Sequence, residues 1–402
     1  MDINLTQPEE EHLAAMMAKI SQEIKQNGGH LAFSRYMHIA LYEPNLGYYS
    51  SDIEKFGVAG DFITAPEISP FFGQTIVSTI LPVLEALKQQ GLPTRVLEFG
   101  AGTGSLAKSI LLELHLRGFD LDEYQIIELS PDLAKRQQLL LKNICHEHAI
   151  HTQCIWLSSI PNHIEGVVLA NEVLDAIPCE RICMHRNIWH RLDIAVDTDS
   201  SPASLVSTIG AALSQAELNK IPPVLLNTEV FADGYTTEVH LQAQAWLRSL
   251  TEQLACGLLL IIDYGFHEQE YYHPQRQSGT LMAHHRHRAL TDVLQFPGIS
   301  DITNHIECSS LLRILEESIH GELFFSSQAS YLLDAGITEL VLQKSDPHDI
   351  EHFLPISNAL QKLISEAEMG ELFKVIAFGK NLETLNLQLN QLPGFAGRNR
   401  FY

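Results

Sequence analysis

Apolar residues recur at helical spacing near the N-terminus, and short apolar runs alternate with helical patterns through the rest of the chain. The N-terminal spacing predicts helices over 12–27 and 33–41, and the loop that follows over 42–72 has neither period 2 nor period 3.6. The predicted strands are 95–99, 123–129, 154–157, 166–170, 257–264, 322–325 and 372–377, and the later helices are 74–90, 106–117, 132–146 and 237–255. This alternation predicts an α/β fold in which helices cover both faces of a mostly parallel sheet.

The predicted elements divide the chain into an N-terminal helical extension with its loop, 1–90, and a sheet domain, 91–402. Their regular spacing is interrupted at about 176–238, where 179–195 alternates like added strands and 197–223 is rich in Ser, Ala and Pro. We interpret this stretch as an insertion in the sheet domain and not as an independent domain.

Composition and charge exclude some classes of protein and some kinds of binding partner. With 402 residues, 45% of them hydrophobic and 19% charged, the chain has ample material for a packed core, which excludes a disordered or collagen-like protein. The 26 basic and 49 acidic residues give a net charge of −23, which repels nucleic acid and anionic membranes. We therefore expect no nucleic-acid or membrane partner and favour a cationic one, although ordinary acidity for solubility explains the charge equally well.

The cysteines and the N-terminus indicate the cellular compartment in which we expect the protein. The six cysteines are scattered without a CxxC pair, which predicts reduced thiols. The acidic N-terminus shows no signal or transit peptide, and the longest apolar stretch, 257–262, is too short to span a bilayer. These features predict a cytoplasmic protein.

The most informative stretch is a glycine turn between a strand and a helix. The apolar run 95–99 leads into Gly100-Ala101-Gly102-Thr-Gly104, and a helical pattern follows at once. Glycine lets the backbone turn tightly and lets a ligand approach, while the helix N-terminus offers unpaired N–H groups. A GxGxG turn alone is a modest signal, because any tight strand-to-helix turn can recruit glycine.

Two acidic residues sharpen the prediction. Glu98 lies two positions before the first glycine, and Glu128 ends the next predicted strand 30 positions later, where it is placed to accept hydrogen bonds from both ribose hydroxyls. A compact turn preceded by a carboxylate suits a ligand with an amino acid and a sulfonium in place of phosphates. We predict S-adenosylmethionine as the cofactor, held by Glu98, the turn, Glu128 and Leu129.

Each acid also has a structural interpretation. Glu98 suits a buried strand carboxylate paired with an arginine or a backbone donor, and Glu128 suits a helix-capping or turn acid. Because Ser130 already supplies capping chemistry for the next helix, we expect Glu128 to be left for a ligand.

Polar residues follow two later strands. Asn171, Glu172 and Asp175 come after the strand at 166–170, and Asp263 lies near the end of the strand at 257–264. The carboxyl ends of parallel strands line the ligand crevice of an open sheet, so we expect these groups to converge there, with Asn171 on the cofactor. Taken singly, each is also typical of a solvated loop.

At this point the sequence resembles the MidA-type, DUF185, S-adenosylmethionine-dependent methyltransferases, whose mitochondrial members assist assembly of respiratory complex I. The resemblance spans nearly the whole chain. It is carried by Pro44-Asn-Leu-Gly-Tyr-Tyr, Gly60-Asp-Phe-Ile-Thr-Ala-Pro-Glu, Glu98-Phe-Gly-Ala-Gly-Thr-Gly-Ser-Leu, Glu128-Leu-Ser-Pro, Ala170-Asn-Glu-Val-Leu-Asp-Ala-Ile-Pro, Ile262-Asp-Tyr-Gly, Gly279-Thr-Leu, His284-His-Arg-His-Arg and Pro297-Gly-Ile-Ser-Asp-Ile-Thr-Asn-His.

The resemblance implies a class I methyltransferase fold, a Rossmann-like sheet whose last strand, within 371–380, is antiparallel. It also implies methylation of an arginine in a protein partner, a respiratory complex I subunit. This chain has Val173-Leu174 where the family often shows a phenylalanine pair, and Ala283 where the family has a cysteine. The first departure could alter the shape of the substrate pocket.

Methyl transfer to a guanidinium requires alignment and carboxylates. The acceptor is protonated at neutral pH, so acidic side chains must hold its charge while one nitrogen attacks. We predict Glu172 and Asp175 as the first catalytic candidates and Asp61 and Glu67, in the N-terminal loop, as a second pair.

Two further interpretations concern metal and alternative functions. The histidine run at 284–288 has no acidic or thiolate partner at ligand spacing and contains arginine, so we predict no metal. The run either contacts substrate, closes over the sheet crevice or is a solvated basic loop. The alternatives to a methyltransferase are a non-catalytic, cofactor-binding assembly factor and an NAD-dependent oxidoreductase.

Overall fold

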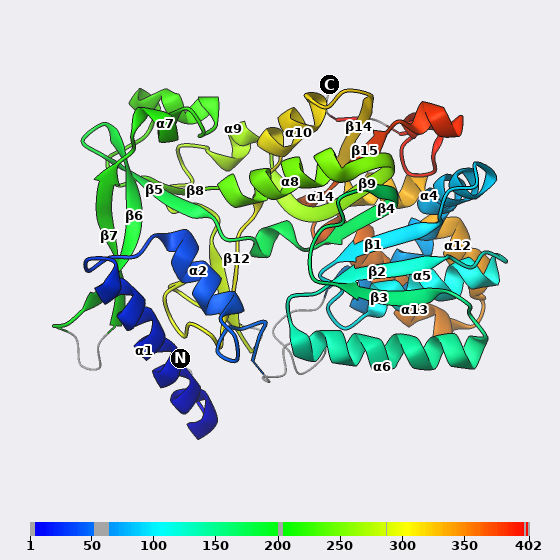
Figure 1. The fold of residues 1–402 in the computed structure, drawn as a ribbon, viewed down its shortest axis with the longest axis horizontal. Helices are drawn as coiled ribbons and strands as arrows, with labels where there is room; N and C mark the ends of the chain where they lie inside the picture. The colour runs from blue at the N-terminus through cyan, green and yellow to red at the C-terminus, as the bar shows by residue number, and fades with distance from the viewer. Residues whose placement is uncertain (1–4, 52–63, 200–203, 287, 398, 401–402) are drawn as a thin grey trace. The chain divides into compact units, whose positions relative to one another are not determined.

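The structure, a computed structural model, describes residues 5–51, 64–199, 204–286, 288–397 and 399–400 (Figure 1). Contacts divide the chain into two units, each assembled from segments far apart in the sequence. The accessory unit comprises 1–62, 174–246 and 266–310, and the sheet unit comprises 63–173, 247–265 and 311–402.

The sheet unit is built around a mostly parallel sheet. Its strands, in spatial order, are β14 (Gly321–Ser327), β15 (Phe373–Lys380), β9 (Leu254–Phe266), β4 (Ile164–Asn171), β1 (Arg95–Phe99), β2 (Glu123–Ile127) and β3 (Gln153–Leu157). The strands from β9 to β3 run parallel, whereas β15 is antiparallel to both β9 and β14. This arrangement confirms the predicted Rossmann-like sheet with an antiparallel last strand.

Helices pack with this sheet. They are α3 (Ala65–Ile68), α4 (Pro70–Gln89), α5 (Ser105–Leu116), α6 (Pro131–His148), α11 (Gln328–Asp334), α12 (Ile337–Lys344), α13 (Ile350–Ile364) and α14 (Met369–Leu372). Two more, α8 (Leu241–Gln253) and α10 (Cys308–Glu316), begin in the accessory unit and end in the sheet unit. The side chain of Ser69 caps α4 by accepting the N–H of Phe71 at 3.2 Å.

The helix α4 is long and apolar enough to cross a membrane by length and composition alone. However, 67% of its most apolar window is buried inside the protein, where it packs on α5. The apolar pattern of α4 is therefore that of a core helix.

The accessory unit combines two N-terminal helices with two small sheets. Its helices are α1 (Gln7–Gln26), α2 (Phe33–Tyr42), α7 (Gln215–Leu218) and α9 (Glu268–Tyr271). One sheet has the order β7 (Ser204–Ala212), β6 (Ile188–Asp197), β5 (Glu180–His185) and β8 (Thr236–Val239), all antiparallel. The other has the order β11 (Arg288–Ala289), β10 (Met282–His285) and β12 (Asp301–Thr303). The two-residue strand β13 (Ile306–Glu307) comes next in the sequence and is not part of this sheet.

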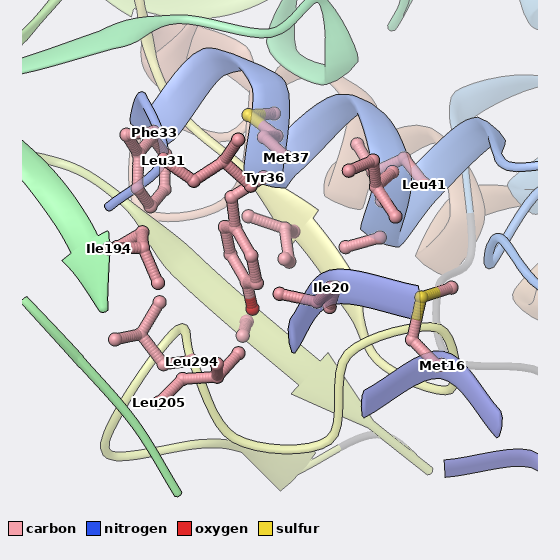
Figure 2. Packing of buried hydrophobic residues seen from close by; sticks show 14 of the residues in the cluster. Met16, Ile20, Leu31, Phe33, Tyr36, Met37, Leu41, Ile194, Leu205 and Leu294 are labelled. Carbon is pink, nitrogen blue, oxygen red and sulfur yellow. The ribbon is translucent and has the colours of Figure 1, made fainter. Parts of the chain in front are cut away.

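The core of the accessory unit joins residues from all of its segments. Figure 2 shows Tyr36 of α2 between Ile20 of α1 on one side and Ile194 and Leu294 on the other, which come from β6 and from the loop before β12. Met16 of α1 belongs to the same cluster. The Tyr36 hydroxyl donates a hydrogen bond to the carbonyl of Val293 at 2.9 Å. The N-terminal helices thus share one apolar cluster with the strands inserted later in the chain.

These units divide the chain differently from the predicted borders at 1–90 and 91–402. The segment 74–90, predicted within the extension, lies in α4 of the sheet unit, and the predicted insertion belongs to the accessory unit together with 266–310. The physical reason is the shared core: the inserted strands bury their apolar faces against α1 and α2.

One helix boundary is corrected, and one strand was not predicted. The predicted helix 237–255 begins only at Leu241, because Thr236–Val239 pairs with β5, Thr237 opposite Ile182. The Ser-, Ala- and Pro-rich stretch contains β7, which pairs with β6.

In the described part of the histidine run at 284–288, His285 is buried in the accessory unit, whereas Arg286 and Arg288 are exposed. Arg286 donates hydrogen bonds to both carboxylate oxygens of Glu9 in α1, each at 2.7 Å. His285 contacts the carbonyl of Ile299 at 2.8 Å. Arg286 and His285 therefore tie the β10 hairpin to α1 and to the loop before β12.

Candidate functional site

The glycine turn joins β1 to α5 with left-handed backbone at all three glycines. The φ angles are 60° at Gly100, 55° at Gly102 and 86° at Gly104, a region that only glycine enters without strain. A Cβ at Gly100 would lie 3.3 Å from Val173, and one at Gly104 would lie 3.1 Å from Leu140, whereas one at Gly102 would meet no described atom within 4 Å. The outer glycines thus allow close packing, and the middle one leaves open space beside the turn.

Glu98 is buried in β1 beneath this turn. Its Oε2 accepts a hydrogen bond from the Tyr124 hydroxyl of β2 at 2.7 Å, so its partner is a tyrosine and not the arginine or backbone donor of the structural interpretation. Burial raises the pKa of Glu98 to about 7, the Tyr124 hydrogen bond lowers it, and the charge of Glu128 raises it further. The predicted Ala101 is likewise buried in the turn, at 7% exposure.

Glu128 lies just past the end of β2 and is already engaged by the protein. Its Oε1 accepts the backbone N–H of Ser130 at 2.9 Å, and its Oε2 accepts the side-chain N–H of Gln137 at 2.8 Å. Ser130 caps α6 as predicted, its hydroxyl accepting the N–H of Leu133 at 3.3 Å. The cap does not leave Glu128 free, because the carboxylate binds the backbone of the capping residue itself.

The environment of Glu128 still leaves it suited to a ligand. Burial raises its pKa, while hydrogen bonds from the backbone of Ser130, the side chain of Gln137 and the backbones of Leu129 and Gly102 lower it. A carboxylate has about four lone-pair sites, so hydroxyl donors can be added to those already bound. Leu129, beside it, is 66% exposed, so its side chain is accessible for contact with a bound apolar ring.

The end of β4 presents Asn171 and Glu172. Glu172 has φ 53°, and its N–H is fixed to the carbonyl of Ile262 in β9 at 2.9 Å. Its Oε1 accepts the Asn171 amide at 3.1 Å and the N–H of Ala65, the first residue of α3, at 3.3 Å. Asn171 Oδ1 is buried, and none of the described residues donates a hydrogen bond to it.

The short helix α3 brings a second predicted carboxylate to the same place. Glu67 Oε1 accepts the hydroxyl of Thr103, in the glycine turn, at 2.5 Å, and the hydroxyl of Ser105 lies 3.5 Å away. Glu67 and Glu172 therefore both contact the α3–turn region of the sheet unit. Asp61 lies outside the described residues.

Asp263 has a structural role, whereas the catalytic role of Asp175 stays a prediction. Asp175 belongs to the accessory unit and is 5% exposed, and its backbone carbonyl accepts two hydrogen bonds from Asn304, at 3.1 and 2.7 Å. Asp263 is fully buried and accepts the backbone N–H groups of Val173 at 3.2 Å and Tyr264 at 2.9 Å, which fixes the ends of β4 and β9.

The sequence analysis missed Thr103, Tyr124 and Gln137, which hold the predicted carboxylates. Only Gln137 leaves a signal in the sequence, since it is a polar residue on the apolar stripe of a helix. Thr103 and Tyr124 become partners only through the fold.

The comparisons decide the family. The model described as "Putative S-adenosyl-L-methionine-dependent methyltransferase" matches residues 75–323, more than half of the chain. The chain belongs to this family. It is an S-adenosylmethionine-dependent methyltransferase, and the oxidoreductase alternative is set aside.

The relatives agree with this assignment. The chain is 28% identical to "Protein arginine methyltransferase NDUFAF7, mitochondrial" of Danio rerio over 86% of this chain and 82% of that protein. It is 25% identical to the Drosophila melanogaster homolog, over 92% and 86%. A Burkholderia thailandensis crystal structure of a "likely methyl transferase" bound to S-adenosyl-homocysteine is 40% identical, with a TM-score of 0.88 over 100% of this chain and 99% of that one.

The residues of this methyltransferase fit its cofactor. The open side of Gly102, the exposed Leu129 and the remaining lone pairs of Glu128 offer a close approach, an apolar contact and hydroxyl acceptors. The unsatisfied Oδ1 of Asn171 is an acceptor at the end of β4. We therefore expect the turn, Glu128, Leu129 and Asn171 to hold S-adenosylmethionine.

Proposed function

We propose that this methyltransferase modifies a guanidinium nitrogen of an arginine in a partner protein, with Glu172 and Glu67 as the carboxylates that receive the guanidinium. The observation that carries the proposal is the meeting of both acids at α3. The first residue of α3 donates its N–H to Glu172, and the third is Glu67, which contacts Thr103 of the glycine turn.

The chemistry of the acceptor calls for such a pair. A guanidinium remains protonated at neutral pH, and carboxylates that fork onto its N–H groups hold the charge and orient one nitrogen. S-adenosylmethionine, when bound, would supply a methyl group made electrophilic by its sulfonium, and the electron pair of the broken carbon–sulfur bond would stay on sulfur. The acceptor nitrogen loses one proton as the new C–N bond forms, and we assign that proton to Glu172.

The backbone of Glu172 supports this assignment. A non-glycine residue with positive φ costs roughly 1–2 kcal/mol, and residues held this way cluster at functional sites. Here the hydrogen bond to Ile262 holds the strained residue at the end of β4. The direction of the carboxylate is thereby fixed before any substrate binds.

Charge and relatives support a cationic protein acceptor. The net charge of −23 attracts a basic segment, and the Danio rerio and Drosophila melanogaster relatives carry arginine methyltransferase names. On the resemblance alone, we extend the proposal to a respiratory complex I subunit as the acceptor protein.

The test uses the full chain with radiolabelled S-adenosylmethionine and an extract of cells that lack this protein. Label is expected on arginine after acid hydrolysis, and Glu172→Gln is expected to lower the transfer rate by about 100-fold or more. The exposed Glu85 of α4 provides the matched control, Glu85→Gln, which is expected to leave the rate unchanged.

Binding of S-adenosyl-homocysteine separates the outcomes. Glu172→Gln is expected to retain it, because the assigned role concerns the acceptor. Label on lysine or on a carbon or oxygen atom would overturn the arginine assignment. Tight cofactor binding by the wild type without label on any protein would instead support the non-catalytic assembly factor.

A further inference from the structure

A fully buried glutamine interrupts the apolar stripe of α6. The buried residues of this helix are Leu133, Gln137, Leu141 and Ile144, so Gln137 occupies a position that the helical period reserves for an apolar side chain. It has 0% exposure. Burying an amide is costly unless its hydrogen bonds are made, so the partners of Gln137 need an explanation.

The partners of Gln137 come from three different elements. Its Nε2 donates to the carbonyl of Gly102 at 2.8 Å and to Oε2 of Glu128 at 2.8 Å, and its Oε1 accepts the indole N–H of Trp156 in β3 at 2.9 Å. The chemistry allows one orientation of the amide only: a carbonyl and a carboxylate accept, and an indole donates. Its aliphatic part packs beside Gly104, where an added Cβ would lie 3.6 Å from its Cγ.

These contacts connect the two parts of the cofactor site. The Gly102 peptide, which has open space on its other side, is held through its carbonyl, and the Glu128 carboxylate is held through one oxygen. We propose that Gln137 is a positioning residue for S-adenosylmethionine, which sets the Gly102 peptide and the Glu128 carboxylate in their binding geometry through one side-chain amide.

A purely structural role is the competing explanation, and the two differ in what they predict. If Gln137 only completes the hydrogen bonds of buried groups, its replacement lowers the stability of the apoprotein and leaves the affinity of the folded protein for the cofactor unchanged. If Gln137 holds Gly102 and Glu128 in their binding geometry, a folded variant binds the cofactor more weakly. Part of the binding free energy is then used to order Gly102 and Glu128.

The first experiment compares Gln137→Met with Gln138→Met in the full-length chain. Methionine keeps an unbranched side chain of similar length against Gly104 but removes both N–H donors and the oxygen that accepts the Trp156 indole N–H. Gln138 is the exposed neighbour on the same helix and controls for the chemical change. Calorimetry with S-adenosyl-homocysteine is expected to show binding about 10- to 100-fold weaker for Gln137→Met, the loss of one or two hydrogen bonds, one of them to a charged group.

Kinetics provide a readout that a structural role does not move. The KM for S-adenosylmethionine is expected to rise by the same factor, while kcat at saturating cofactor and the KM for the acceptor stay within about twofold of the wild type. Circular dichroism and thermal unfolding establish that the variant is folded. A folded Gln137→Met that binds S-adenosyl-homocysteine as tightly as Gln138→Met would overturn the proposal.

A second variant, Gln137→Glu, keeps the test decisive if the methionine variant does not fold. When protonated, the new carboxyl can donate to Gly102 or Glu128 and accept from Trp156; when ionised, it repels Glu128, and the neighbouring Glu98 adds to the negative charge. The ratio of variant to wild-type Kd for S-adenosyl-homocysteine is therefore expected to increase with pH. A ratio that stays at about 1 at every pH would refute the positioning role.

Discussion

Replacing Gly102 by alanine should separate backbone strain from cofactor binding. The residue has φ 55°, and an added Cβ would meet no described atom within 4 Å, so the cost to the apoprotein is the left-handed backbone alone. This cost is about 1 kcal/mol relative to glycine, which corresponds to a fall in Tm of roughly 2–4 °C in a unit of this size. The added Cβ would occupy the open side of the turn, where we expect the cofactor to bind.

A matched control is present in the same unit. Gly91, in the turn between α4 and β1, has φ 72°, and its added Cβ also meets no described atom within 4 Å. It precedes β1, whereas Gly102 follows it, so Gly91→Ala carries the same strain at the opposite end of the strand. Gly104→Ala should destabilise more than either, because its Cβ would lie 3.1 Å from Leu140.

Calorimetry with S-adenosyl-homocysteine, together with thermal unfolding of the apoproteins, provides the comparison. We expect Gly102→Ala and Gly91→Ala to lose similar stability, and only Gly102→Ala to bind the nucleoside about 10-fold or more weakly, a change of about 1.4 kcal/mol. Equal affinities for the two variants would refute the inference that the open side of Gly102 faces the cofactor.

Two further predictions concern buried carboxylates. Burial raises the pKa of Glu98 from 4.5 to about 7. The protonated side chain therefore contributes fully to the free energy of unfolding below pH 4.5, and about 3 kcal/mol of that free energy is lost as the pH rises through about 7. Urea unfolding should show this fall in the wild type and not in Glu98→Gln; parallel pH profiles would contradict it. Glu9→Gln should lower the unfolding free energy of the accessory unit by about 1 kcal/mol, since it loses the carboxylate whose two oxygens both accept from one guanidinium nitrogen of the half-exposed Arg286. The exposed Glu10→Gln is the control, and an equal loss in both variants would count against the pairing.

The sheet could be predicted because its strands carry local signals. The strand β1 has the predicted bounds, since Pro93 precedes its apolar run and Gly100 ends it. The strand β8 could not be predicted in the same way. Its residues fit the helical pattern that continues into α8, and only pairing with β5 makes them a strand.

The candidate site shows the same limit. The glycine turn and Glu98 are adjacent in sequence, and Glu128 follows the next apolar run, so all could be predicted, whereas the Tyr124 partner of Glu98 depends on the register of two strands. Tyr124 lies opposite Val96, whose side chain shares a face of the sheet with Glu98. No local pattern specifies that register. The unit borders could not be predicted for a related reason, since the accessory core joins segments separated by more than a hundred residues.

The interleaving of the two units has a consequence for how the polypeptide emerges from the ribosome. Met16, Ile20 and Tyr36 share their core with Leu294 and Ile302, so the first helices cannot complete the burial of their apolar faces until nearly three quarters of the chain has been translated. During that interval their hydrophobic surface is exposed and is a ready target for chaperones. Nascent chains stalled shortly before and shortly after these residues emerge should therefore differ sharply in protease resistance.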